Sequence, residues 1–253
     1  METQKVVSHE EWLRARRELL AMEKAFTHQR DALTRHRMAM PWERIEKDYD
    51  FDAPEGKRKL ADLFDGRRQL LVQHFMLAPG WEEGCKSCSY MADHTDGMNV
   101  HLNHRDVTFL AVSRAPLAEI ERFRRRMGWQ FKWVSSYGGD FNRDFGVTFT
   151  PEEVAKGKIY YNYSSMWPYP HEELPGISVF YKDDAGVVFH TYSTYGRGVE
   201  VMMGTYNMLD LTPKGRDEDH LKFTMEWVRH HDRYEPVAKA APAAASSCCA
   251  AHT

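Results

Sequence analysis

The sequence lacks long hydrophobic runs and a strong net charge. Its longest apolar stretches, Leu70–Leu77 and Val107–Val112, are far shorter than the ~18 residues that cross a bilayer, and the start METQKVVSHEEW has no apolar signal core. Lys and Arg number 34 against 37 Asp and Glu, for a net charge of −3, so the chain has no overall attraction to nucleic acid or to anionic membranes. We therefore expect a cytoplasmic globular protein that binds neither nucleic acid nor membrane.

Cysteine is also scarce, because the 253 residues contain only 4, as the close pairs Cys85 with Cys88 and Cys248 with Cys249. Two short-range pairs in a chain of this length exclude a disulfide-framework protein and favour redox or metal chemistry. The second pair lies in AKAAPAAASSCCAAHT, a stretch with nothing to bury, so we expect residues 236–253 to form a disordered tail. Its cysteines belong either to a variable terminus or to mobile thiols that exchange with the first pair.

The N-terminal region carries a helix signal. Ser8 and Glu11 have the spacing of a capping box, and apolar residues then follow at mixed helical spacing among charged ones. This pattern predicts a long helix that ends near Pro41, with a solvated face rich in Arg and Glu. We assign residues 1–45 to a helical extension, whose length is compatible with a homodimer but does not require one.

Residues 46–235 have the pattern of one α/β domain. A helical turn at Leu60–Phe64 precedes the buried strand Leu70–Leu77, and a helix start at Cys85, the strand DVTFLAVS and the helix PLAEIERFRRRMG follow. Alternation of helices with nearly continuously apolar strands indicates a βαβ unit and a sheet covered on both faces. Further along, strand-like alternation on both sides of DDAG predicts a hairpin, which makes the sheet mixed.

The last third of the chain contains two predicted helices and an aromatic cluster. The helices are VEVMMGTYNMLDLT and KFTMEWVRHHDRYE, and we expect His230 and His231 on a half-exposed polar face of the second. The aromatic cluster either lines a ligand groove or packs a strand against its following loop, and packing is the simpler interpretation. Its members are Tyr160, Tyr161, Tyr163, Trp167 and Tyr169.

The strongest chemical signal is the segment CKSC, from Cys85 to Cys88. Two cysteines separated by two residues in the first turn of a helix can close a disulfide, and the first thiol lies over unpaired backbone amides that favour its thiolate. Since the thiolate is the nucleophile of disulfide exchange, Cys85 is the predicted attacking thiol and Cys88 the resolving one. Glu82 and Glu83 oppose this ionisation, so the sequence leaves the net shift in the pKa of Cys85 open.

Metal binding is the alternative for the same cysteines. Twelve residues separate Cys88 from His101, and two more separate His101 from His104, a spacing close to that of a small zinc finger but with a shorter second spacer. A related alternative is copper(I), held by the two thiolates with His94 or His190. Zinc or copper is the cofactor in these interpretations, whereas the redox interpretation needs no cofactor.

Pro175 is the third candidate site residue, in LPGI ahead of the predicted hairpin. A proline fits the start of a strand because it cannot donate a hydrogen bond to the ladder. In thiol-exchange folds such a proline often takes the cis form and presents backbone to a bound disulfide. We expect Pro175 to shape the docking surface for a substrate.

Three segments together resemble the thioredoxin superfamily, with a CxxC at a helix start and a proline before the terminal hairpin: WEEGCKSC, DVTFLAVSRAPLAEIERFRRRMGW and LPGISVFYKDDAGVVFHTYSTYGRG. The stretch WVSSYGGDFNRDFGV resembles a peroxiredoxin segment. From about Val6 to Tyr234 the chain is similar to a bacterial thioredoxin-like family, domain of unknown function 899, described as predicted dithiol-disulfide oxidoreductases. Lys86 and Ser87 stand where thioredoxin has Gly-Pro, and Glu82 stands where peroxiredoxins have threonine, which argues against a peroxidase pocket.

The resemblance implies a thioredoxin-like mixed central sheet flanked by helices, with a long N-terminal helical extension and a disordered C-terminal tail. It also implies a dithiol-disulfide oxidoreductase that acts on a disulfide-containing protein or a small thiol, with Cys85, Cys88 and Pro175 at its site. The alternative is a zinc- or copper-binding protein, such as a copper carrier or a copper-thiolate oxidase. Its ligands are Cys85 and Cys88 with His94, His101 or His104.

Overall fold

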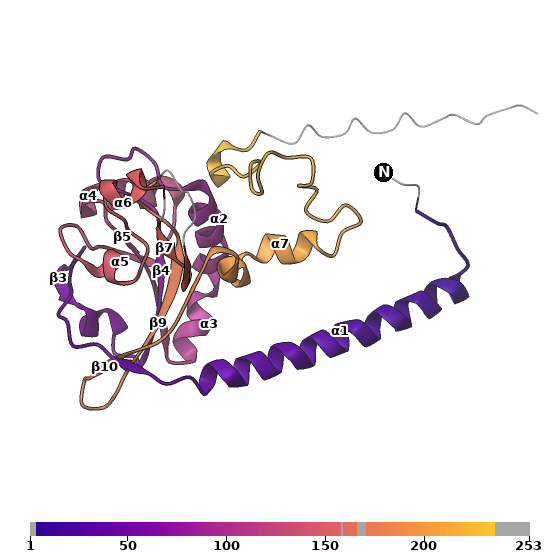
Figure 1. Ribbon diagram of the computed structural model, residues 1–253, viewed down its shortest axis with the longest axis horizontal. Coiled ribbons are helices and arrows are strands. Elements are labelled where there is room, and N and C mark those ends of the chain that lie inside the picture. The colour runs from indigo at the N-terminus through magenta and orange to yellow at the C-terminus, as the bar shows by residue number, and fades with distance from the viewer. Residues whose placement is uncertain (1–3, 158, 166–170, 236–253) are drawn as a thin grey trace, which may run out of the picture.

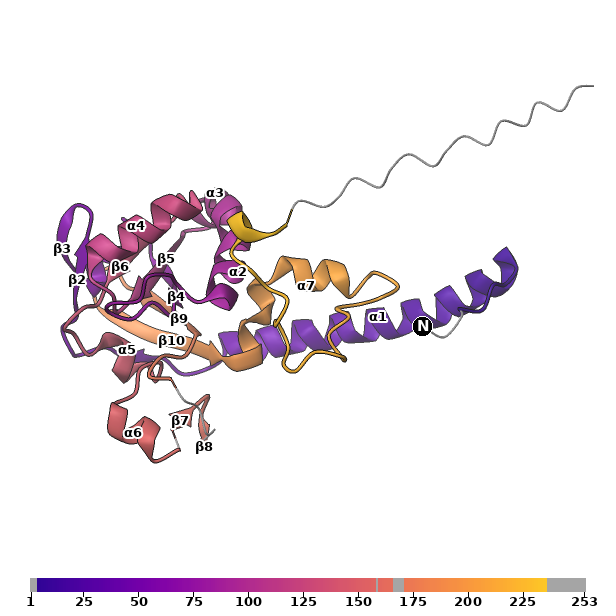
Figure 2. The same ribbon diagram turned by 90° about the horizontal axis from the view of Figure 1, so that it is seen from above.

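Helix α1 (His9–Met38) opens the chain and extends away from the α/β domain in both views (Figures 1 and 2). The computed structural model describes residues 4–157, 159–165 and 171–235, so the predicted tail lies outside the described residues. The capping box is confirmed, since Ser8 Oγ accepts a hydrogen bond from the Glu11 amide and the Glu11 carboxylate accepts one from the Ser8 amide.

The α/β domain is built on an eight-stranded mixed sheet within the described residues, in the order β1-β10-β9-β4-β5-β6-β2-β3. Strands β4, β5 and β6 are parallel, and β9 and β10 form the predicted antiparallel hairpin beside β4. A βαβ unit followed by a hairpin is the thioredoxin-like arrangement expected from the sequence. The strands are β1 (Glu43–Arg44), β2 (Asp50–Ala53), β3 (Gly56–Lys59), β4 (Gln69–His74), β5 (Val107–Ser113), β6 (Lys132–Ser135), β9 (Gly176–Lys182) and β10 (Val188–Tyr195).

Helices cover both faces of this sheet (Figure 2). Alternate side chains of β4 point to opposite faces, so that Leu71 packs toward α2, α4 and α7, whereas Leu70 and Val72 pack toward α5 and the 3₁₀ turn Leu60–Phe64. The helices are α2 (Lys86–Thr95), α3 (Asn99–His104), α4 (Leu117–Met127), α5 (Phe141–Asp144), α6 (Pro151–Ala155) and α7 (Gly204–Leu209), and a separate two-stranded sheet pairs β7 (Tyr160–Tyr161) with β8 (Ser164–Ser165). Among the described residues, none of the helices combines the length and the apolar character that crossing a bilayer requires.

Two predicted elements differ from the structure. Strand β4 ends at His74 rather than Leu77, because the chain leaves the sheet toward a turn in which the Trp81 amide bonds the Ala78 carbonyl at 3.1 Å. The predicted helix KFTMEWVRHHDRYE is wrong, since this segment holds only turns and a 3₁₀ turn at His231–Arg233. The physical reason is that the backbone amide of Met225 donates a hydrogen bond to the Glu218 carboxylate. This amide is then not available for the hydrogen bond that a helix would need there.

Candidate active site

Cys85 occupies the position directly before the first residue of α2. Its amide donates to the Met76 carbonyl at 3.0 Å, which ties the start of the helix to the chain that leaves β4. Its own carbonyl accepts hydrogen bonds from both the amide and the hydroxyl of Ser89, each at 2.9 Å. The predicted placement of Cys85 at a helix start is therefore confirmed, and its sulfur lies at the end of α2 where backbone amides lack helical partners.

The pKa values of the two cysteines are shifted in opposite directions. A hydrogen bond from the Cys88 thiol, followed by the backbone amides of Cys88 and Ser87, outweighs burial and lowers the pKa of Cys85 to about 7. The same hydrogen bond, together with burial, raises the pKa of Cys88 well above its ordinary value of 9.0. Cys88 is only 1% exposed, whereas Cys85 is half-buried, and both thiols are free. The pair thus combines a partly exposed residue whose thiol ionises more readily with a buried residue whose thiol ionises less readily.

Arginines pair with Glu83, one of the two acidic residues that were expected to oppose ionisation of Cys85. The Glu83 carboxylate pairs with Arg126 at 2.7 Å and also with Arg233. Arg126 lies on α4 and Arg233 near the end of the described chain, so two distant elements meet beside the start of α2. Because the negative charge of Glu83 is shared with two guanidinium groups, its destabilising effect on a nearby thiolate is offset.

A buried carboxylate, that of Glu173, contributes to the electrostatics of Cys88. Glu173 is 1% exposed and forms an ion pair with Arg114. Burial raises the pKa of Glu173 despite this pairing, and the negative charge of Glu173 contributes to the raised pKa of Cys88. The side-chain amide of Gln73 donates from Nε2 to the Cys88 carbonyl at 3.0 Å. Sequence analysis missed Glu173 and Arg114, because their meeting depends on segments that lie 59 positions apart.

Pro175 lies at the same end of the sheet as Cys85. Gly176, the first residue of β9, pairs with His74, the last residue of β4, and two residues beyond His74 is Met76, whose carbonyl accepts the Cys85 amide. The peptide bond before Pro175 is not cis, because no cis peptide bond occurs in the described part of the chain. Hydrogen bonds hold both sides of this proline: the Leu174 amide donates to Val147, and the Pro175 carbonyl accepts from a tyrosine hydroxyl at 2.5 Å.

The predicted metal ligands are not brought together. His94 uses both ring nitrogens, since Nδ1 donates to the Tyr90 carbonyl at 2.6 Å and Nε2 accepts from the Thr205 amide at 2.9 Å. His101 and His104 are exposed on α3. Across the described ranges, no group of three or more His, Cys, Asp or Glu side chains is arranged to hold a metal ion. The zinc-finger spacing therefore does not correspond to a site in this fold.

His190 likewise lies in a different setting from the one predicted for a copper ligand. Its Nε2 bonds Ser193 Oγ at 2.7 Å, and its Nδ1 lies 3.3 Å from the Glu43 carboxylate. Ser193 Oγ also contacts Ser178 Oγ at 2.8 Å, and Ser178 in turn bonds the buried His74. This chain of polar groups lies among β9, β10 and the end of β4, and it contains no cysteine.

His230 is buried, contrary to the half-exposed position predicted for it. Its ring is 2% exposed, donates from Nε2 to the Gly84 carbonyl at 2.9 Å and packs edge-on against Phe123. The neighbouring His231 is more exposed and bonds the Asp93 carboxylate at 2.7 Å. No local pattern identifies His230 as a site residue, because its partner Gly84 lies 146 positions earlier in the chain.

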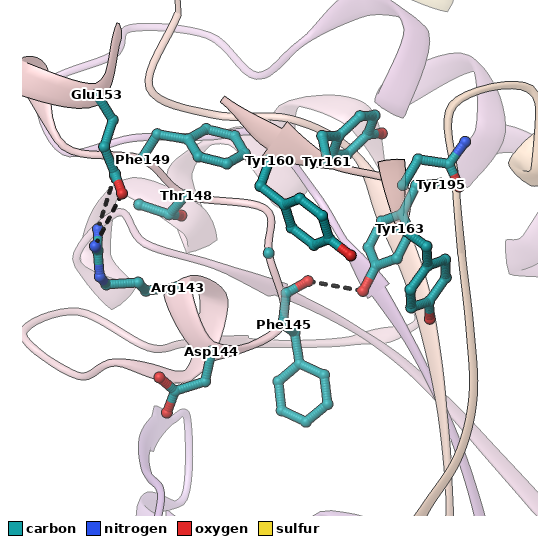
Figure 3. Close-up of a pocket in the computed structure, with 12 residues that line it drawn as sticks. Arg143, Asp144, Phe145, Thr148, Phe149, Glu153, Tyr160, Tyr161, Tyr163 and Tyr195 are labelled. Atoms are coloured by element: carbon teal, nitrogen blue, oxygen red, sulfur yellow. Dashed lines mark hydrogen bonds and ion pairs between the residues drawn. The ribbon is translucent and has the colours of Figure 1, made fainter. Parts of the chain in front are cut away.

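Part of the predicted aromatic cluster lines a pocket of about 390 Å³, shown in Figure 3. Tyr160, Tyr161 and Tyr163 contribute to it together with Tyr195, whereas the predicted Trp167 and Tyr169 lie outside the described residues. Hydroxyls in this group bind backbone: that of Tyr195 donates to the Phe145 carbonyl at 2.8 Å, and that of Tyr163 to the Ser193 carbonyl at 3.3 Å. These bonds are typical of packing, and no cysteine lines the pocket.

Comparison with known proteins gives one family and weak structural similarities. A model of the family "Bacterial protein of unknown function (DUF899)" matches residues 1–234, and no curated protein gives a match. The peroxidoxin BcpB of Mycobacterium tuberculosis is 15% identical with a TM-score of 0.41, covering 65% of this chain and 94% of its own. A putative thiol:disulfide interchange protein DsbE of Chlorobium tepidum is 13% identical with a TM-score of 0.40, covering 66% and 98%. At these values the similarities assign no activity.

Proposed function

The chain belongs to the bacterial family DUF899, and we propose that it is a thiol-disulfide oxidoreductase in which Cys85 attacks a substrate disulfide and Cys88 resolves the mixed disulfide. The observation that carries this proposal is the difference in burial and in pKa between the two cysteines. Cys85 is half-buried with its pKa lowered to about 7, and Cys88 is sealed with a raised pKa. An attacking thiol works best when its pKa is near the ambient pH, because both thiolate fraction and nucleophilicity are then substantial.

The reaction balances with these two sulfurs and no cofactor. The Cys85 thiolate attacks one sulfur of the substrate disulfide, a mixed disulfide forms, and the other substrate sulfur leaves as a thiolate. Cys88 gives its proton to that leaving thiolate and attacks the Cys85 sulfur, which releases the second substrate sulfur to take a proton from solvent. The substrate gains two electrons and leaves as two thiols, and the protein holds a Cys85–Cys88 disulfide that an external thiol reduces again.

The burial of Cys88 and the position of Pro175 are compatible with attack by Cys85 and with resolution by Cys88. Burial of Cys88 keeps it protonated until the mixed disulfide forms, so that Cys85 alone meets the substrate. We assign Pro175 to the docking surface, because it lies at the same sheet end as Cys85. The substrate class is a disulfide-containing protein or a small disulfide, and we place the reaction in the cytoplasm, where the thiol pool keeps such a pair reduced.

Trapping the intermediate tests this proposal directly. With insulin as the disulfide probe and dithiothreitol as the reductant, the wild-type protein is expected to accelerate insulin reduction. Incubated with insulin after dithiothreitol has been removed, Cys88→Ser should accumulate a covalent adduct through Cys85 that a reducing gel removes, because the resolving thiol is missing. Cys85→Ser should give neither turnover nor adduct.

The tail cysteines supply the matched control. The variant Cys248→Ser/Cys249→Ser removes both tail thiols, one more than either site variant removes, and should keep the wild-type rate. Undiminished insulin reduction by Cys85→Ser, or an adduct that forms through the tail instead, would show that Cys85 is not the nucleophile.

A further inference from the structure

Helix α1 presents a largely apolar stripe, interrupted by Gln29 and His36, that no other described part of the chain buries. None of the residues in α1 is buried, and large side chains on one face stand in solvent, with Met22 70% and Phe26 64% exposed. Large apolar residues recur at intervals of seven, and the stripe is completed by residues three positions after each. The seven-spaced set is Trp12, Leu19, Phe26 and Leu33, and the second set is Ala15, Met22, Gln29 and His36.

A seven-residue repeat indicates the kind of partner that fits this stripe. On a straight helix such a repeat drifts by about 20° per heptad, and a left-handed supercoil with another helix of the same repeat removes the drift. A 30-residue helix that buries none of its residues gains little from its own packing, since most helical stability in proteins comes from burying an apolar face. The repeat therefore calls for another helix with matching spacing.

We propose that α1 pairs with α1 of a second copy of this chain in an antiparallel coiled coil. In a parallel pair each residue of the stripe would face its own copy, so that two Phe26 rings, two Gln29 side chains and two His36 rings would meet. An antiparallel pair centred between Met22 and Phe26 instead avoids these self-pairings and, outside its central layer, places large residues opposite smaller or polar ones. Its layers are Met22 with Phe26, Leu19 with Gln29, Ala15 with Leu33, and Trp12 with His36.

One pair of opposite charges at the flank of the stripe agrees with this orientation. Glu23 and Arg30 both occupy the position after the second apolar residue of a heptad, and an antiparallel pair places equivalent flanks against each other. Glu23 of each copy then faces Arg30 of the other, which gives two symmetric ion pairs. Arg16, on the same flank, is already held by Glu23 of its own helix at 2.8 Å.

A groove at the C-terminal end of α1 can accept the N-terminal end of the partner helix. A groove of about 390 Å³ lies there, lined by Arg37, Met38 and Trp42 together with Tyr181 and Tyr192 of the hairpin. The antiparallel register brings Trp12 of the second copy to the level of His36, directly beside this groove. The two α/β domains then lie at opposite ends of the coiled coil, where they do not compete for space.

The oligomeric state of the full chain tests the pairing. Sedimentation equilibrium over a concentration series should give twice the chain mass of 29.5 kDa. Met22→Glu/Phe26→Glu places charges in the central layer and should halve the mass while far-UV circular dichroism retains the α/β domain. The matched control Leu20→Glu/His28→Glu lies on other faces of the same helix and should stay dimeric. A monomeric wild-type chain, or a dimer that survives the central substitution, overturns the proposal.

Cross-linking tests the orientation in a chain whose four native cysteines are replaced by serine. Trp12→Cys protein mixed with His36→Cys protein should oxidise to a disulfide-linked dimer, because these positions share a layer in the antiparallel pair. Trp12→Cys alone should remain uncross-linked, since its two copies lie at opposite ends. Rapid cross-linking of Trp12→Cys to itself indicates a parallel pair and overturns the antiparallel assignment. The result does not depend on the redox proposal, because no site cysteine is present.

Discussion

The buried imidazole of His230 donates a hydrogen bond from Nε2 to the carbonyl oxygen of Gly84, over 2.9 Å. Gly84 directly precedes Cys85, so this hydrogen bond connects the segment that contains His230 to the residue before the candidate nucleophile. The same ring contacts Phe123 of α4, with ring centroids 5.3 Å apart. One histidine thus connects the C-terminal part of the described chain to α4 and to the residue before Cys85.

Replacing His230 should loosen this junction. In His230→Ala the Gly84 carbonyl loses its partner and a cavity opens beside Phe123, so the free energy of unfolding should fall by about 1–3 kcal/mol. The alkylation rate of Cys85 should change as well, because the backbone before it is less restrained. Urea unfolding and iodoacetamide labelling measure the two effects. His231→Ala is the control: its exposed pair with Asp93 is worth less than about 1 kcal/mol, and equal losses from both variants would contradict the junction role of His230.

Gly84 should not tolerate a side chain. A Cβ at this position would lie 2.6 Å from a ring carbon of Phe75 and 2.7 Å from one of Phe123, closer than packed carbon atoms approach. Gly84→Ala is therefore expected to lower the free energy of unfolding by about 1–3 kcal/mol through overpacking. Gly97→Ala provides the comparison, because a Cβ there meets nothing within 4 Å. If thermal unfolding of the two variants is alike, the close packing around Gly84 is not as described.

The reactivity of Cys85 should depend on the thiol of Cys88. Because the hydrogen bond from Cys88 is the largest cause that lowers the pKa of Cys85, Cys88→Ala should raise that pKa from about 7 toward the ordinary value of 9.0. The thiolate fraction at neutral pH then falls, and alkylation of Cys85 slows. The measurement is the rate of iodoacetamide labelling against pH.

A comparison of Ser87→Ala with Cys88→Ala tests how much each side-chain hydrogen bond contributes to the lowered pKa of Cys85. The Ser87 hydroxyl is the smallest of the lowering causes, so its removal should move the midpoint of labelling in the same direction but less than Cys88→Ala. A midpoint that stays at neutral pH in Cys88→Ala would show that the helix amides alone set the pKa of Cys85.

His74 should make the fold sensitive to acid. Burial lowers its pKa from 6.5 to about 3, so below pH 6.5 the unfolded chain binds a proton that the folded chain rejects. Folding stability then decreases as pH falls through this window, by up to about 1.4 kcal/mol per pH unit from this residue. His74→Gln keeps a polar partner for Ser178 but does not titrate. Urea unfolding at a series of pH values should give the variant a shallower decline between pH 6 and pH 4, and parallel curves would contradict this role.

Local signals account for the elements that the sequence predicts correctly. Ser8 and Glu11 cap α1, Gly128 ends α4 with a φ of 72° that favours glycine, and the DDAG turn joins β9 to β10. The placement of Cys85 at a helix start belongs to this group, because a break at Pro79 and a following helix are visible in a few residues. These features depend on neighbours in sequence, and so a single sequence contains them.

Contacts between distant segments account for what the sequence does not predict. KFTMEW has a helical pattern, but Glu218 accepts hydrogen bonds from Tyr206, Met225 and Trp227, and these side-chain contacts replace a helix with turns. The bond from His230 to Gly84 also joins parts of the chain that no local pattern relates. The sequence therefore identifies the two cysteines as candidate site residues, but it does not identify the distant residues, such as His230, that pack beside them.

The ion pair of Arg114 with Glu173 leads to the last prediction. Arg114→Met removes the positive partner and leaves the carboxylate of Glu173 buried alone, which should lower the free energy of unfolding at neutral pH by about 3–5 kcal/mol. Loss of the Arg114 charge raises the pKa of Glu173 further, because this charge favours the ionised carboxylate. Above the ordinary value of 4.5 the unfolded chain is then ionised while the folded chain resists ionisation, so stability falls as pH rises.

The pH profile and a second substitution separate this effect from simple loss of packing. Urea unfolding of Arg114→Met should show a smaller deficit near pH 5 than near pH 7, since Glu173 is closer to neutral at the lower pH. Arg114→Met/Glu173→Leu should recover stability relative to the single variant, because a buried ion pair replaced by apolar residues costs little. It also removes the negative charge that faces Cys88, so in a Cys85→Ser chain the pKa of Cys88 should fall. A deficit that is constant with pH and persists in the double variant would mean that Arg114 acts through packing alone.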